Sequence, residues 1–182
     1  MERGYFMRAK KNILITGPPG IGKTTIVRKL AQKLNAPGPA GFYTAEIRDG
    51  GVRQGFELVG FNGRKGLLSH IDIKSRHHVG RYGVDVKGFE AFLDGLALTD
   101  PNVALVMIDE IGKMECLSQR FKTAVRTVLD SEKTVIATIA QKGTGFIEEA
   151  RVREDARLFE ITLENRESLI EEILRYVRAT YG

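Results

Sequence analysis

The segment LITGPPGIGKTT, residues 14–25, decides the fold that we expect for this chain. A short apolar run ends there in two prolines and three glycines, and a lysine and two threonines follow directly. Gly17, Gly22, Lys23 and Thr24 occupy the fixed positions of the pattern G-x-x-x-x-G-K-[ST]. Such a loop joins a buried strand to the first turn of a helix and wraps a phosphate group with backbone N–H groups. The segment therefore predicts a strand, a phosphate-binding loop and a helix.

The chemistry of this loop assigns roles to its polar side chains. Lys23 is expected to place its ammonium group over the β- and γ-phosphates of a nucleotide, and Thr24 to bring its hydroxyl group to Mg²⁺. The alternative is a glycine-rich turn that binds nothing, although three glycines are more than such a turn needs. The residues expected to bind the nucleotide here are Gly17, Pro18, Pro19, Gly20, Ile21, Gly22, Lys23, Thr24 and Thr25.

A second motif, which is acidic, follows the apolar run VALVMI at residues 103–108. Asp109 is expected to hold the metal, usually through water, and Glu110 to act as the general base that polarises a water molecule. The alternative is a pair of solvated loop acids. Of the following residues, Lys113 and Glu115 are expected on the surface, and Gly112 is expected to relieve a tight turn.

Two further groups of residues are candidates for the same site. An arginine often completes transition-state stabilisation in phosphoryl transfer, and Arg151, Arg153 and Arg157 precede the last expected strand. We take Arg153 as the candidate catalytic arginine, the alternative being a solvated helix face with acidic ion-pair partners. Asn165 follows that strand and is a candidate for contact with base or ribose, or for a helix cap.

Composition limits the classes of protein that the chain can represent. With 182 residues we expect one domain, residues 1–182. The net charge of +5 favours anionic ligands, but the basic residues are dispersed among 23 acids, so a nucleic-acid partner is possible and not favoured. A single cysteine, Cys116, and the lack of a signal sequence or an apolar membrane span favour a cytoplasmic protein without membrane attachment, expected as a monomer.

The order of apolar patterns predicts an α/β protein. Strands are expected at 11–16, 103–108, 134–139 and 158–162, and helices at 23–34, 88–98, 118–129 and 166–181. Connectors are expected at 35–41 and 75–86, and a connector or short helix at 143–153. The turn signals DGG and NGRKG predict antiparallel hairpins inserted at about 41–73. The expected architecture has three layers, with helices on both faces of a mostly parallel sheet.

Other reactive residues are expected to be structural. His77 and His78 have no acid or cysteine at a spacing typical of zinc ligands, and Cys116 is expected to be a small packing residue. The hairpin aromatics alternate with polar residues, which favours one face packed on a core over a base-stacking platform. These aromatics are Phe42, Tyr43, Phe56 and Phe61.

Taken together, five motifs make the chain resemble the thermophilic or cancer-related nucleoside-triphosphatase family of P-loop proteins. The motifs are GPPGIGKTT (17–25), GFYTAEIR (41–48), VGRYGVDV (79–86), VMIDEIGKME (106–115) and NRESL (165–169). The first and fourth occur in many P-loop proteins, and their order together with the others makes the set specific. The resemblance covers the chain after its first ten residues.

This resemblance implies a three-layer P-loop fold and Mg²⁺-dependent release of phosphate from nucleoside triphosphates. The implied substrates are ATP, GTP, CTP, UTP and TTP, with little choice of base and slow turnover. It also makes the acid after the metal-binding Asp109 the hydrolytic base. A second nucleotide-binding segment is implied at Leu105, Val106, Met107, Ile108, Asp109, Glu110, Ile111 and Gly112.

Two other functions are compatible with the motifs. The arginines of RVREDAR, residues 151–157, are similar to the lid of a nucleoside or nucleotide kinase, which must exclude water where a hydrolase admits it. A nucleotide-dependent switch that binds RNA or protein is the other alternative, with residues 41–73 and the basic segment 76–81 as its contact surface.

Overall fold

The computed structural model describes residues 10–34 and 38–181. The start of the chain and the middle of the expected connector at 35–41 lie outside the described residues. The described strands are β1 (Asn12–Thr16), β2 (Ala40–Asp49), β3 (Val52–Gly60), β4 (Lys65–His70), β5 (His78–Val79), β6 (Tyr82–Val84), β7 (Leu105–Ile111), β8 (Thr134–Ile139) and β9 (Ala156–Glu160). The helices are α1 (Lys23–Lys33), α2 (Val86–Asp94), α3 (Gln119–Asp130), α4 (Phe146–Arg151) and α5 (Ser168–Tyr181), with a short 3₁₀ turn at Glu115–Leu117.

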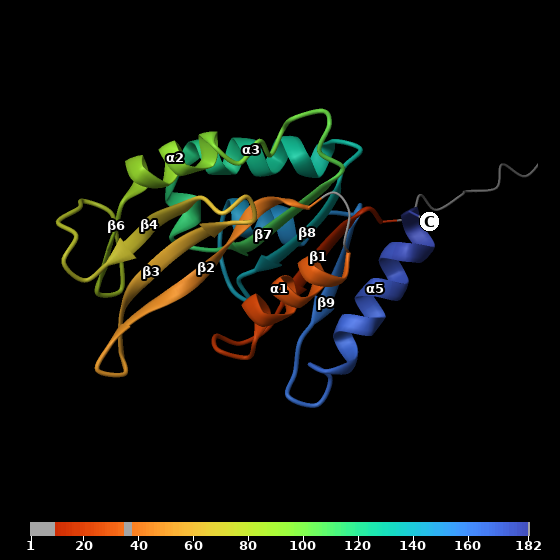
Figure 1. The fold of residues 1–182 in the computed structure, drawn as a ribbon, viewed down its shortest axis with the longest axis horizontal. Coiled ribbons are helices and arrows are strands. Elements are labelled where there is room, and N and C mark those ends of the chain that lie inside the picture. Colours follow the sequence, from red (N-terminus) through yellow and green to blue (C-terminus); the bar gives the residue numbers. More distant parts are fainter. Residues whose placement is uncertain (1–9, 35–37, 182) are drawn as a thin grey trace, which may run out of the picture.

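All of these strands belong to one twisted sheet, which Figure 1 shows with α2 and α3 above it and α1 and α5 below it. Their order is β5-β6-β4-β3-β2-β7-β8-β1-β9. From β2 to β9 the neighbouring strands are parallel, whereas from β2 to β5 they are antiparallel. The expected hairpins therefore continue the central sheet, because β2 pairs with β3 on one side and with β7 on the other.

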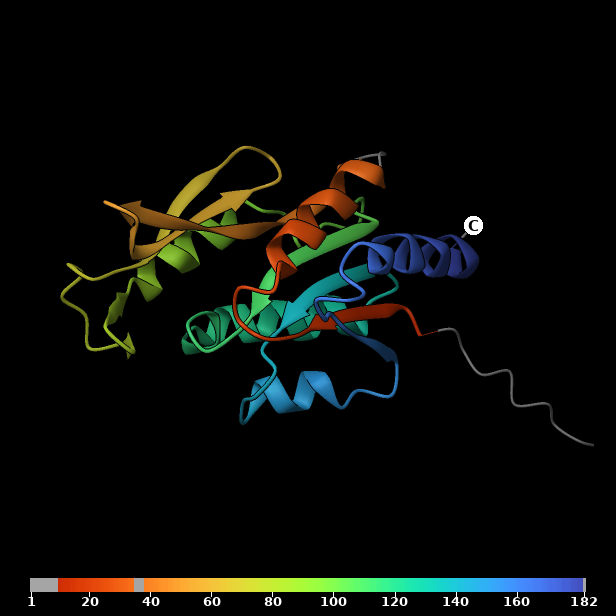
Figure 2. The same cartoon turned by 90° about the horizontal axis from the view of Figure 1, so that it is seen from below.

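Helices cover both faces of the sheet, as Figure 2 shows in side view. The apolar residues of each buried strand alternate between the two faces, so that Ile13 and Ile15 pack on one side and Leu14 on the other. On the side of Ile13 and Ile15, side chains of α1 and α5 complete the first core. On the side of Leu14, side chains of α2, α3 and α4 complete the second core. The expected α/β class with helices on both faces is confirmed.

The hairpin region is anchored to the second core by aromatic residues. Phe42 of β2 is fully buried and makes edge contacts with the rings of Phe89, Phe92 and Phe121, at centroid distances of 5.7 to 6.3 Å. Such contacts bring α2 and α3 against the start of β2. They hold the antiparallel strands in a fixed position next to β7.

The segment 75–86 differs from its prediction as a loop, because it contains β5 and β6. Two glycines, at positions 80 and 83, and several polar residues hide this short edge hairpin from a pattern based on apolar alternation. The following helix begins at Val86, two residues before the predicted start. Asp85 causes this, since its side chain accepts a hydrogen bond from the Gly88 N–H at 2.9 Å and caps the helix.

Within the described residues, none of the helices is both long enough and apolar enough to cross a lipid bilayer.

Candidate functional site

The loop between β1 and α1 is rich in glycine and leads into a helix N-terminus that no side chain among the described residues caps. Gly22 precedes the helix at φ 114°, a conformation that a side chain would strain. Gly17 approaches the loop after β9 so closely that a Cβ atom there would lie 2.5 Å from the Ile161 side chain. The glycines therefore allow both the turn and its close packing, and the first N–H groups of α1 remain available to an anion.

Lys23 is the first residue of α1, and its side chain reaches back to the loop. Its ammonium group donates to the Gly17 carbonyl at 3.0 Å and lies 3.4 Å from the Pro18 carbonyl. The Nζ atom is also 3.5 Å from Oε2 of Glu110, and the Lys23 side chain is only 10% exposed. The loop thus holds one positive charge beside the predicted acid Glu110.

Three threonine hydroxyl groups surround the Asp109 carboxylate. Thr24 donates to Oδ2 at 2.6 Å and Thr138 to Oδ1 at 2.6 Å, while the Thr44 hydroxyl lies 3.4 Å from Oδ2. Asp109 is 2% exposed. Because these donors come from α1, β8 and β2, three separate elements fix the orientation of one carboxylate.

The strand register brings Asp109 and Glu110 to the site. Ile108 pairs with Ala137 and Ile111 pairs with Ile139, so two residues of β7 stand where β8 has one, Thr138. The extra residue interrupts the regular alternation of side chains. Both acids lie within β7 as the structure has it, since the strand runs to Ile111 rather than ending at Ile108 as predicted.

Glu110 occupies a mixed electrostatic environment. Burial raises the pKa of Glu110 above its ordinary value, the ammonium group of Lys23 lowers it in part, and the neighbouring Asp109 carboxylate raises it again. A carboxyl group with a raised proton affinity that still meets a cation suits acid–base chemistry.

Glu115 corrects our expectation of a surface residue, because it is 6% exposed. A Cβ atom on Gly112 would lie 2.8 Å from Oε2 of Glu115 and also 2.8 Å from Oε1 of Glu110, so the two carboxyl groups are close neighbours. Burial raises the pKa of Glu115 to about 8, and the Glu110 charge adds to this rise. The absence of a side chain on Gly112 leaves room for both acids.

These residues open into a cleft with a volume of about 770 Å³. One part of its wall comes from the loop and α1, and another from the strands that follow. The lining residues are Gly17, Pro19, Gly20, Gly22, Lys23, Thr24, Arg28, Tyr43, Thr44, Ala45, Glu46, Arg53, Phe56, Leu68, Val79, Asp109, Glu110, Lys113, Met114, Glu115, Ala140, Gln141 and Lys142. The volume is within the usual range of small-molecule sites.

The structure does not bring the predicted catalytic arginine to this cleft. Arg153 pairs with Asp130 and Asp155, at 2.8 Å each, beside the amino ends of β1 and β9. The phosphate loop lies at the opposite, carboxyl end of β1. A catalytic role for Arg153 is therefore not supported, because its guanidinium is held by two carboxylates at the wrong edge of the sheet.

The two neighbouring arginines are not among the residues that line the cleft, and both are engaged in other contacts. Arg151 donates to the Gln141 carbonyl and pairs with Glu148, while Arg157 stacks on the Tyr176 ring at 4.4 Å. The ion-pair alternative that we kept open for this segment accounts for Arg151 and Arg153. Arg28 and Arg53 line the cleft instead.

Asn165 holds the loop after β9 together. Its side-chain oxygen accepts from the Thr162 N–H at 2.8 Å, and its Nδ2 atom donates to the Glu160 carbonyl at 2.8 Å. These bonds stabilise the turn that enters α5, and Asn165 does not line the cleft. Of the two roles expected for Asn165, the helix cap agrees better with these contacts than a contact with base or ribose.

Pattern reasoning missed several residues of the site. Thr138, which donates to Asp109, is the last residue but one of β8, and the rule that ligands meet the carboxyl ends of parallel strands could have found it. Thr44, Glu46 and Arg53 belong to the hairpin β2–β3, whose position against β7 leaves no local sequence signal. Tyr43 and Phe56 also line the cleft. Of the hairpin aromatics expected to pack on a core, Phe42 is therefore in the core, whereas Tyr43 and Phe56 contribute to the site.

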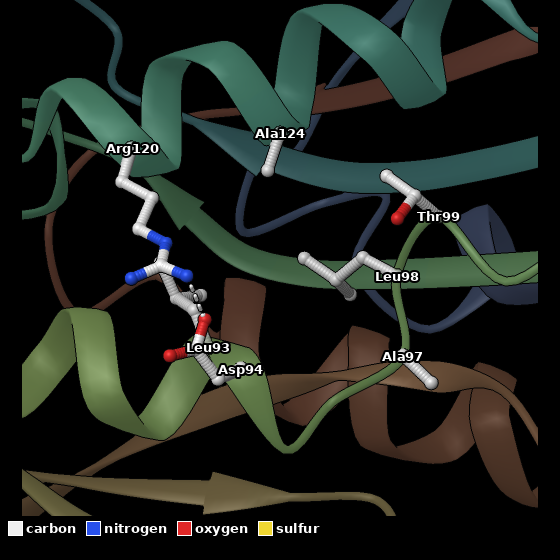
Figure 3. A pocket seen from close by; sticks show the side chains of 7 residues that line it. All are labelled: Leu93, Asp94, Ala97, Leu98, Thr99, Arg120 and Ala124. Atoms are coloured by element: carbon white, nitrogen blue, oxygen red, sulfur yellow. Dashed lines mark ion pairs between the residues drawn. The ribbon is translucent and has the colours of Figure 1, made fainter.

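A smaller hollow of about 250 Å³ lies between the end of α2 and α3. Figure 3 shows Leu93, Leu98 and Ala124 around it, with Arg120 and Asp94 paired across one side. That ion pair has an N–O distance of 2.5 Å and neutralises both charges. The hollow is on the face of the sheet opposite α1 and shares none of the site residues described above.

Comparison with known proteins places this geometry in a family. Residues 12–174 match the model of a protein family described as NTPase. Nucleoside-triphosphatase THEP1 of Thermotoga sp. (strain RQ2) is 42% identical over 171 residues, covering 93% of this chain and 97% of the relative. The human cancer-related nucleoside-triphosphatase is 39% identical over 186 residues, covering 93% and 98%.

A solved structure agrees with the sequence relatives. The crystal structure of THEP1 from the hyperthermophile Aquifex aeolicus superposes with a TM-score of 0.81 at 37% identity, covering 90% of this chain and 97% of that one. Both the fold and the sequence are therefore shared over nearly the full length of these proteins. The chain belongs to the NTPase family that includes these nucleoside-triphosphatases.

Proposed function

We propose that this protein hydrolyses nucleoside triphosphates to nucleoside diphosphates and phosphate. The observation that carries the proposal is the convergence of Lys23, Asp109 and Glu110 on one cleft beside uncapped N–H groups of a helix. The names of the relatives, nucleoside-triphosphatases in bacteria and in humans, support the same reaction.

The residues divide the work of hydrolysis among themselves. The N–H groups of the loop from Gly17 to Thr25 bind the phosphates, and the Lys23 ammonium group stabilises charge on the β- and γ-phosphate oxygens. Glu110 accepts a proton from the water molecule that attacks the γ-phosphorus atom. Its carboxylate lies 3.5 Å from Lys23 Nζ, so base and cation meet where the γ-phosphate is expected.

The donor set of the site fits a magnesium ion. Thr24 Oγ1 and Asp109 Oδ2 are 2.6 Å apart, and both are hard oxygen atoms of the kind that Mg²⁺ binds together with water and phosphate. Within the described residues, no group of three or more His, Cys, Asp or Glu side chains is arranged to hold a metal. Mg²⁺ would neutralise phosphate charge when bound. Thr138 and Thr44 fix the orientation of the Asp109 carboxylate, which would hold the ion together with Thr24.

Broad base specificity and slow turnover complete the proposal. The polar contacts that we can assign reach phosphates and metal, which every nucleoside triphosphate shares. Turnover is expected to be slow because the candidate arginines at 151–157 are engaged in other contacts, and an arginine is worth ~10³–10⁵ in rate. We further propose a single-domain, monomeric protein of the cytoplasm that acts on ATP, GTP, CTP, UTP and TTP.

The test is phosphate release from each of these five nucleotides, with and without Mg²⁺, for the natural chain and for Lys23→Ala. We expect similar rates for all five, no release without Mg²⁺, and a large loss in the variant. A protein that released phosphate equally well with alanine at position 23 would not use this loop, and the proposal would fail.

A further inference from the structure

The cleft extends beyond the phosphate loop and the acids Asp109 and Glu110. Its whole volume is about 770 Å³. Much of its wall comes from the hairpin strands and from the segment after β7. We call this part the hairpin half, lined by Thr44, Glu46, Arg53, Phe56, Leu68, Val79, Met114 and Glu115.

The order of the strands places the hairpin half beyond the γ-phosphate. In the sheet, β2 and β3 lie on one side of β7, while β1 with its phosphate loop lies on the other side. Glu110, on β7, therefore stands between the phosphate loop and the hairpin half. The loop 161–167, which follows β9 at the far edge, contributes no described residue to the cleft lining. The hairpin half is thus at the attacking side of the γ-phosphate.

The side chains of the hairpin half suit a planar, uncharged ligand. Phe56, Val79 and Met114 supply apolar surface, and Leu68, which also lines the cleft, is only 1% exposed. The guanidinium of Arg53 lies over the Phe56 ring at 5.1 Å, and such clusters stack planar heterocycles.

Its charges are balanced against one another. Arg53 pairs with Glu46 at 2.9 Å, so its charge is already compensated. At the other end, the carboxyl groups of Glu110 and Glu115 lie side by side about Gly112. Carboxyl groups exchange hydrogen bonds with hydroxyl groups, whereas a phosphate group needs a cation, and the charge of Arg53 is already compensated. The hairpin half therefore favours a neutral molecule that bears hydroxyl groups.

We propose that the hairpin half of the cleft binds an uncharged nucleoside, with its ring against Phe56 and Arg53 and a hydroxyl group facing Glu110. The placement relative to the γ-phosphate rests on the function proposed above. The nucleoside occupies this half while a nucleoside triphosphate occupies the phosphate loop, so the two ligands bind together and do not compete.

The test measures both ligands on the same full-length chain. Calorimetry first gives the Kd of the non-hydrolysable ATP analogue AMP-PNP with Mg²⁺. Adenosine, guanosine, cytidine and uridine are then titrated separately into the protein saturated with that analogue. We expect at least one nucleoside to bind, with less than a twofold change in the Kd of the analogue when that nucleoside is present.

A matched pair of variants on β3 locates the binding. Phe56→Ala is expected to weaken the nucleoside about tenfold or more, because it removes the stacking surface, and to leave the Kd of the analogue within twofold. Val52→Ala is the control, since Val52 is 52% exposed on the same strand and does not line the cleft. If Phe56→Ala does not fold, magnetisation transfer from the Phe56 ring protons to the nucleoside in the natural chain decides the location.

Three results would overturn the inference. The first is no nucleoside binding to a protein that binds the analogue, which would leave the proposed hydrolase intact. The second is competition between nucleoside and analogue, which would place the base of the nucleotide itself in the hairpin half. The third is equal loss of nucleoside binding in Phe56→Ala and Val52→Ala. Failure of the analogue to bind would instead contradict the proposed function.

Discussion

At the carboxyl ends of β1, β7 and β8 the charged side chains face a cleft, whereas at the amino ends of β1 and β9 they face one another. Lys23, Asp109 and Glu110 line the first region. In the second, Arg153 is held by Asp130 and Asp155, and the side chain of Asn12 donates to Asp155 at 3.0 Å. Both regions combine basic and acidic groups near strand ends. Only in the first region do they converge on a cleft, so we expect a ligand to bind there. In the second region the charged groups pair with one another and serve the structure.

The sharpest test of this contrast removes the proposed base. Glu110→Gln keeps the size of the side chain and its contact with the loop, but it cannot accept the proton from water. We expect phosphate release to fall by ~10²–10⁴-fold while the Kd of AMP-PNP stays within a few-fold. Single-turnover phosphate release and calorimetry measure the two quantities. Equal turnover in this variant would remove Glu110 from the mechanism.

The next largest effect is expected on the metal. Asp109→Asn leaves the hydroxyl groups of Thr24 and Thr138 in place and removes the negative charge that they surround. We expect the Mg²⁺ concentration for half-maximal turnover to rise by about tenfold or more. Titration of phosphate release with Mg²⁺ measures it. Thr138→Val is a useful companion variant, since it removes only the hydrogen bond from Thr138 to Asp109. It is expected to raise the required Mg²⁺ concentration by a smaller factor.

How far the sequence predicts this arrangement depends on how local each signal is. The phosphate loop, Lys23 and Asp109 could be predicted because their spacing along the chain reflects one strand, one turn and one helix. The expected α/β class followed from apolar patterns in the same way. The site roles of these residues remain predictions that the variants above test.

Other features depend on contacts between distant segments and have no local signal. Glu115 and Lys113 are both polar residues after a strand, but only Glu115 is buried, because the 3₁₀ turn carries it back toward the sheet. Arg153 has the same kind of neighbours in sequence as a lid arginine, yet its partner Asp130 comes from the end of α3. The hairpin wall of the cleft depends on the pairing of β2 with β7, which alternation alone does not specify.

Glu115 offers a test within the first region that changes stability rather than turnover. Its pKa of about 8 in the folded protein exceeds the ordinary value of 4.5, so the folded state binds a proton that the unfolded state releases. Its contribution to the free energy of unfolding is therefore greatest below about pH 4.5 and is lost as the pH rises to about 8 and beyond. Between about pH 6 and pH 9, the free energy of unfolding of the natural chain is expected to fall by roughly 1–3 kcal/mol more than that of Glu115→Gln.

Urea denaturation at both pH values measures this difference. Glu167→Gln is the matched control for the loss of one carboxyl group, since Glu167 is exposed in the turn before α5. A Glu115→Gln variant with the same pH dependence as the natural chain would mean that Glu115 titrates as a solvated acid. The carboxyl groups of Glu110 and Glu115 would then not share the space around Gly112.

The smallest effect is expected in the second region and falls on stability alone. Arg153→Gln removes a guanidinium that bridges Asp130 and Asp155, and its side chain is 20% exposed, so partial screening limits the loss to about 1 kcal/mol in the free energy of unfolding. Turnover and the Kd of AMP-PNP are expected to stay within twofold, because the bridge lies at the edge of the sheet opposite the cleft. Arg175→Gln, on the exposed side of α5, controls for the loss of one positive charge. A fall in turnover of tenfold or more in Arg153→Gln, with stability unchanged, would mean that this arginine leaves its two acids during the reaction, and the division between the two edges would no longer hold.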